Sequence, residues 1–198
     1  MHSKLLTTIF LIATYSISTC ANAHLGTETS AQSTLGFLDG LLHPLTGMDH
    51  LAAMLAVGFW SALTARRVWT APLAFAAMLL VGALLGLSGV ELPAVEPMIA
   101  ASLLALGLLV ATSTRLPAVL AATLVGVFAL FHGVAHGTEL GGAANVWAPL
   151  LGMVISTLCL HVAGLGSGLA LRRQNPWLPR LAGAAVTLFG GALLLQMI

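Results

Sequence analysis

Long apolar runs, separated by short polar stretches, follow one another along almost the whole chain. Downstream of the first apolar stretch, six runs have about 20 residues, the length that an α-helix needs to cross the hydrocarbon core of a membrane. They cover residues 44–64, 71–90, 96–113, 117–137, 146–170 and 180–198. The runs are too long for strands, and Ala, Leu and Gly outnumber β-branched residues in them. The pattern predicts an all-α fold, a polytopic membrane bundle of six transmembrane helices.

The stretch before these runs has the form of a cleavable signal peptide, residues 1–23. It has a positive start (MHSK), a short apolar core (LLTTIFLIATYSI) and the small-x-small sequence ANA at 21–23. We expect cleavage after Ala23, so that residues 24–198 form one transmembrane domain; the alternative is an uncleaved first helix. Cleavage would remove Cys20 and leave Cys159 alone, which excludes an intrachain disulfide.

Composition restricts the class of protein further. The chain is 59% hydrophobic and only 7% charged, with a mean hydropathy of +1.02, whereas a soluble domain carries about 25% charged residues. Soluble and disordered classes are excluded, and the lipid bilayer is the expected surrounding. A net charge of +1 without a basic cluster excludes a nucleic-acid partner. The chain has no nucleotide-binding loop, so ATP use by this chain is not expected, while assembly into a homo-oligomer stays open.

The positions of the charges predict the orientation of the spans. Signal cleavage places the new N-terminus outside the cytoplasm, so the loops 65–70, 114–116 and 171–179 should be cytoplasmic. These loops or their flanks hold every arginine of the chain, as the positive-inside rule requires: Arg66, Arg67, Arg115, Arg172, Arg173 and Arg180. We therefore expect both mature ends in the periplasm and a multi-pass protein of the bacterial inner membrane.

Two polar clusters lie at the predicted outer ends of the first and fourth spans. The first is HPLTGMDH at 43–50, with Pro44 expected as the first helical residue and His43 at the cap. His43 and His50 are nearly two turns apart and would share a helix face, while Gly47 would allow a break. Asp49 could bind a metal itself or orient a histidine.

The second cluster is FHGVAHGTE at 131–139. His132 and His136 are four residues apart and Glu139 follows three residues later, so the three share one helix face. Imidazoles with a carboxylate suit a divalent transition metal, and ionisable groups inside spans are functional by default. The predicted metal ligands are His43, Asp49, His50, His132, His136 and Glu139.

Other polar residues are weaker candidates. His24 would start the mature chain, where its α-amine and imidazole could chelate a metal, although an unordered chain end is the simpler interpretation. His161, in the middle of the fifth span, is either a second metal site nearer the cytoplasm or an interhelical hydrogen bonder. Met48 and Met54 are possible soft ligands, but packing is the simpler role. Asp39 could help to collect cations at the entrance.

The two clusters together resemble the HupE/UreJ family of nickel/cobalt permeases. That family has H-P-x-x-G-x-D-H in the first mature span and F-H-G-x-A-H-G-x-E in a later one, and both patterns are complete in HPLTGMDHLAAMLAVG and FHGVAHGTE. The resemblance implies uptake of Ni²⁺, or Co²⁺ in some members, for hydrogenase, urease or cobalamin maturation. The metal would be a transported substrate, with no permanently bound cofactor.

Three other functions compete with a permease. A membrane metalloenzyme would hold the metal at a fixed histidine and carboxylate site with an open coordination position, but the chain has no nucleophile constellation. A haem-binding electron carrier would need axial histidines from two different spans. A purely structural subunit would leave the clustered ionisable groups unexplained. We therefore expect a permease and not an enzyme.

Overall fold

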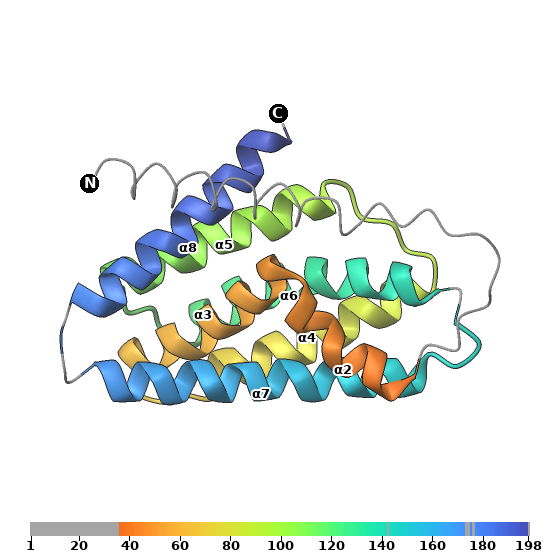
Figure 1. Ribbon diagram of the computed structural model, residues 1–198, viewed down its shortest axis with the longest axis horizontal. Helices are drawn as coiled ribbons and strands as arrows, with labels where there is room; N and C mark the ends of the chain where they lie inside the picture. The colour runs from red at the N-terminus through yellow and green to blue at the C-terminus, as the bar shows by residue number, and fades with distance from the viewer. Residues whose placement is uncertain (1–35, 142, 173–174, 176, 198) are drawn as a thin grey trace, which may run out of the picture. The chain divides into compact units, whose positions relative to one another are not determined.

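The computed structural model describes residues 36–141, 143–172, 175 and 177–197 (Figure 1). Within this part of the chain there are seven α-helices and no strand. The helices are α2 (Phe37–Thr46), α3 (Met48–Thr64), α4 (Thr70–Leu87), α5 (Val95–Thr112), α6 (Ala118–Leu140), α7 (Trp147–Leu171) and α8 (Trp177–Gln196). The predicted signal peptide, Cys20, His24 and Arg173 lie outside the described residues.

Helices α4 to α8 are each long and apolar enough to cross a membrane. Their ends lie within three residues of the five later runs predicted from the sequence. Bilayer thickness sets the length of an apolar helix, which is why hydropathy alone locates these elements. The predicted all-helical fold is thus confirmed for the described residues, and their five long apolar helices agree with the predicted multi-pass membrane protein.

The first predicted span differs from the prediction, because 44–64 is not one helix. The chain forms α2 and α3, with Gly47 in an extended conformation between them. Pro44 lies inside α2, so its expected place at the first helical position, with His43 as the cap, is wrong. Proline cannot donate an intrahelical hydrogen bond, and α2 ends two residues beyond it. A side chain at position 47 would come within 3.1 Å of the Asp49 carboxylate and the His50 ring, which favours glycine at the break.

Glycines bring the backbones of α4 and α6 into direct contact. A Cβ atom on Gly133 would meet the carbonyl oxygen of Leu79, and one on Gly137 would meet that of Ala83. Gly82 of α4 faces α6 in the same way. Small residues allow such close approach between membrane helices. The glycines inside FHGVAHGTE therefore fix α6, and with it the histidines of that cluster, against α4.

The other helices pack in pairs by the same means. Gly58 of α3 and Gly164 of α7 face each other's backbones, and Gly152 of α7 faces the backbone of α2. Gly107 of α5 and Gly183 of α8 also face each other's backbones. Figure 1 shows α5 (green) beside α8 (blue). Helix α7 thus packs against both halves of the broken first span, which holds HPLTGMDH in place.

The arginine-rich loops meet at the end of α3 that lies away from His50. Arg66, Arg67 and Arg115 line one cavity of about 400 Å³. The Trp60 indole of α3 donates a hydrogen bond to the Thr114 carbonyl at 2.9 Å, which ties the end of α3 to the second of these loops. The 17 residues of α3 separate this end from the histidines by about 25 Å. Positive charge and candidate ligands therefore occupy opposite ends of this helix.

Candidate metal centre

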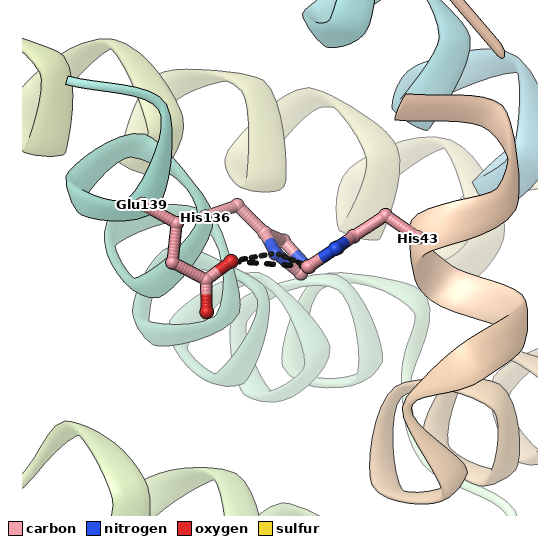
Figure 2. Close-up of side chains that lie close together, drawn as sticks. All are labelled: His43, His136 and Glu139. Carbon is pink, nitrogen blue, oxygen red and sulfur yellow. Dashed lines mark hydrogen bonds and ion pairs between the residues drawn. The ribbon is translucent and has the colours of Figure 1, made fainter. Parts of the chain in front are cut away.

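Three side chains from both sequence clusters converge at one point, which we call the rim cluster (His43, His136 and Glu139). Figure 2 shows His43 reaching from α2 toward His136 and Glu139 on α6. The Nε2 atom of His43 lies 3.0 Å from Nδ1 of His136 and 3.1 Å from Oε2 of Glu139. Nδ1 of His136 is 3.6 Å from the same carboxylate oxygen. Donor atoms around a transition metal at about 2.1 Å are themselves about 3–3.4 Å apart, so this spacing suits one ion.

A second group, His50 and His132, continues from the rim cluster into the bundle. The His50 ring centroid lies 4.5 Å from that of His136 and 5.0 Å from that of His132. Both rings are buried. His50 follows the break at Gly47, so the expectation that His43 and His50 share a face of one helix is wrong, although their ring centroids are 6.4 Å apart. The break turns both rings toward the same site from two separate helices.

Hydrogen bonds set the tautomers of these buried rings. Nδ1–H of His50 donates to the Asp49 carboxylate at 2.8 Å, and Nδ1–H of His132 donates to the Phe128 carbonyl at 3.0 Å. A carboxylate and a carbonyl can only accept, so the lone pair of each neutral ring lies on Nε2. Asp49 therefore orients His50 in the way that carboxylates orient metal-binding histidines.

The Nε2 atoms of His50, His132 and His136 are buried and have no hydrogen-bond partner among the described residues. An unsatisfied buried polar atom costs about 1–3 kcal/mol, and three such atoms in one place call for a ligand. His136 offers Nδ1 to the rim cluster and Nε2 to the interior, so one ring borders both groups.

Exposure falls along this series of side chains. The side chains of His43 and Glu139 are 40% and 39% exposed, whereas that of His136 is 1% exposed. Asp49 is partly exposed beside the buried His50. The six candidate ligands are therefore not one coordination sphere. They form an accessible set of donors followed by a buried set.

The weaker candidates lie elsewhere. Met54 is buried in the apolar core, and Met48 lines an apolar cavity at the surface, which agrees with a packing role for both. Asp39 accepts a hydrogen bond from the Gly36 backbone at 2.7 Å and so caps α2. His161 is fully buried on α7, away from the rim cluster, and its Nδ1–H donates to the Met54 carbonyl.

Nearly the whole chain is similar to a known protein family. A family model described as HupE / UreJ protein matches residues 12–193. The chain belongs to the HupE/UreJ family. A relative named Protein HupE, from Rhizobium leguminosarum bv. viciae, is 42% identical over 195 residues, which is 98% of each chain. No solved structure shows significant similarity to this chain.

Membership of the HupE/UreJ family confirms the resemblance carried by the two sequence motifs. The family is associated with nickel and cobalt uptake for hydrogenase and urease, and its members are accessory proteins of transport type rather than enzymes. In this family member, the two motifs that identify the family are also the two segments whose side chains meet at the rim cluster and the buried histidines.

Exchange of Asp49 for asparagine tests the role of the hydrogen bond to His50. Asp49→Asn removes the charge that fixes the Nδ1–H tautomer, so metal affinity should fall by about 10- to 100-fold, as for other residues that orient a metal-binding histidine. Binding of Ni²⁺ to the purified protein measures this. Asp39→Asn makes the same chemical change on an exposed carboxylate and should leave the affinity unchanged. Equal affinities in the two variants would contradict the role given to Asp49.

Proposed function

We propose that this HupE/UreJ protein is a secondary-type permease that takes up Ni²⁺ or Co²⁺ from the periplasm into the cytoplasm. The observation that carries the proposal is the run of donors from the accessible rim cluster to the buried His50 and His132, between helices that could span a membrane. A fixed catalytic metal needs a single set of ligands with one open coordination position, whereas a transported ion needs successive sets. The ion would supply hydrogenase, urease or cobalamin maturation.

The donors support a stepwise transfer. A hydrated cation would first contact the exposed His43 and Glu139, whose carboxylate offsets part of its charge in a low-dielectric surrounding. His136 would complete this set through Nδ1, with the ring proton on Nε2, and transfer of that proton to Nδ1 would then free the Nε2 lone pair for the ion on the interior side. His50 and His132 would bind next through their unpartnered Nε2 atoms, with Asp49 supplying the second carboxylate.

The proposed topology has six crossings and both mature ends in the periplasm. Five are the long helices α4 to α8, and the first is α3 with α2 at its entrance. The 17 residues of α3 extend about 25 Å, slightly less than the hydrocarbon core of about 30 Å, and α2 would supply the remainder at the outer surface. Signal-peptide cleavage after Ala23 and residence in the inner membrane complete this proposal.

Accumulation of radioactive nickel and cobalt in cells tests the proposal. The host should lack its own uptake systems and express wild type, His50→Ala or His136→Ala at matched membrane levels. We expect the wild type to accumulate metal and both variants to lose at least about 90% of this uptake. The ratio of the two metals in the wild type would then assign the substrate. Absence of accumulation by inserted wild-type protein would contradict the proposal.

Metal binding should depend on pH through His43, which lies on α2 outside the five long helices. Its hydrogen bond to the Glu139 carboxylate raises the pKa of His43 above the ordinary value of about 6.5. Because the imidazolium must lose its proton to bind a metal, Ni²⁺ affinity should be highest in the alkaline range. It should decline as pH falls through this raised pKa, beginning above about pH 6.5. Equilibrium dialysis of Ni²⁺ against the purified protein measures the curve, and full affinity at about pH 5 would contradict histidine ligation.

A further inference from the structure

His161 has the features of a metal-binding histidine but is not part of the groups described above. It lies on α7 and is fully buried. Its Nδ1–H donates to the backbone carbonyl of Met54 on α3 at 2.8 Å, which leaves the lone pair of the neutral ring on Nε2. Nε2 is buried and has no partner among the described residues. A histidine needed only to join two helices would use one nitrogen, as this one does, but would gain nothing from burying the other.

Thr157 gives a second, independent sign of a ligand at this place. It lies four residues before His161 on α7, so the two side chains share a helix face. Thr157 is fully buried, and its hydroxyl has no hydrogen-bond partner in the described chain. Most threonines inside a helix return their hydroxyl to the carbonyl four residues earlier, as Thr64 does to Trp60. Thr157 does not, and its oxygen remains available together with Nε2 of His161.

Phe75 of α4 connects this place to the buried histidines. Its ring centroid is 5.6 Å from that of His132 and 5.2 Å from that of His161, and both contacts are of the edge type. Phe75 is fully buried. One aromatic ring therefore stands between the end of the donor series at His132 and the next unpartnered imidazole.

From these contacts we propose that His161 and Thr157 form a second binding station for the transported Ni²⁺ or Co²⁺, reached from His132 past the Phe75 ring. The inference rests on the proposed permease function and extends its path along α7. His161 Nε2 supplies a nitrogen ligand, and the Thr157 hydroxyl supplies an oxygen or holds a water of the partly hydrated ion. Phe75 separates the two stations, so that an ion must pass an apolar ring between them.

Two exchanges of His161 separate ligation from helix packing. In His161→Asn the amide nitrogen takes the place of Nδ1 and can still donate to Met54, while the Nε2 ligand is lost. In His161→Gln the amide lies near the position of Nε2, while the donor to Met54 is lost. If His161 only joins α7 to α3, the asparagine variant transports as wild type. If His161 is a metal ligand, neither asparagine nor glutamine can replace it. We then expect nickel influx to fall about tenfold or more in both variants.

The measurement is initial uptake of radioactive nickel by cells expressing each variant at matched membrane levels, with Ni²⁺ binding to the purified protein measured alongside. Both variants should still bind Ni²⁺ at the rim cluster, which is intact, and should lose only the binding contributed by the second station. This binding also shows that the variants fold. Wild-type uptake by His161→Asn would overturn the second station while the permease function stands. A wild type that takes up no nickel would refute the proposed function and this inference together.

Thr157→Val provides a second test with little risk to folding. Replacing an unsatisfied buried hydroxyl by a methyl group of similar shape is neutral or stabilising for packing. Loss of uptake in this variant, expected to be about two- to tenfold, therefore reports a function of the oxygen. Thr187→Val makes the same change on α8, where the hydroxyl is bonded to the Gly183 carbonyl, and should transport as wild type. Equal uptake by the two valine variants would remove Thr157 from the station.

Discussion

Glu139→Gln is expected to reduce nickel uptake by about 100-fold at unchanged membrane levels. Glu139 is the carboxylate of the rim cluster, 3.1 Å from the donor nitrogen of His43 and 3.6 Å from that of His136. Glutamine keeps the size and shape of the side chain but loses the charge that offsets a divalent cation, which is otherwise costly to bring into a low-dielectric surrounding. The initial rate of radioactive nickel uptake measures the effect.

Glu96→Gln is the matched control for this substitution. Glu96 is an exposed carboxylate in the first turn of α5, so the same chemical change there should leave uptake at the wild-type rate. A similar decrease in both variants would indicate a general effect of negative charge on cation collection. Wild-type uptake by Glu139→Gln would remove this residue from the permeation path.

Gly137→Ala should strongly destabilise the protein. The new methyl carbon would collide with the carbonyl oxygen of Ala83 and would lie 2.9 Å from the backbone nitrogen of Leu87. Both atoms belong to the backbone of α4 and cannot turn aside, so α6 must move away from α4. Overpacking of this kind typically costs about 1–3 kcal/mol, and here it would also displace His136, the preceding residue on α6. We expect little protein to remain monodisperse after detergent extraction, and a lowered melting temperature in what remains.

Gly166→Ala, on α7, is the control for the alanine substitution. A Cβ atom at Gly166 would meet nothing within 4 Å, and alanine is a better helix former than glycine by about 1 kcal/mol. This variant should therefore be at least as stable as wild type. Size-exclusion chromatography and thermal unfolding compare the two. Equal stability of both variants would contradict the close packing of α4 and α6.

The sequence predicts much of this fold because one physical constraint, the thickness of the bilayer, determines the length of the apolar helices. The runs at 71–90 and 117–137 correspond to α4 and α6 for this reason. Hydropathy does not predict the backbone conformation at the end of a span, where bilayer thickness no longer constrains the chain. There Pro44 and Gly47 interrupt the helix, and their effect depends on how α2 packs on α7.

The sequence predicts the candidate ligands because histidines and carboxylates are rare in spans. It does not predict how these ligands divide into two groups. His136 and Glu139 meet His43, whereas His132 meets His50, and this division follows from the break at Gly47. Thr157 and Phe75 carried no signal at all, because buried threonine and phenylalanine are ordinary residues of an apolar helix. Only the unpartnered hydroxyl and the two ring contacts distinguish them.

Nickel flux through the purified protein distinguishes a transported ion from a fixed one. Wild-type protein reconstituted in liposomes would be given radioactive nickel outside, with His136→Ala in parallel. We expect saturable accumulation of nickel in the lumen by the wild type, with many ions per protein chain, and none by the variant. A stoichiometric amount of slowly exchanging nickel on the wild type, with no accumulation in the lumen, would contradict a permease and indicate a fixed metal centre.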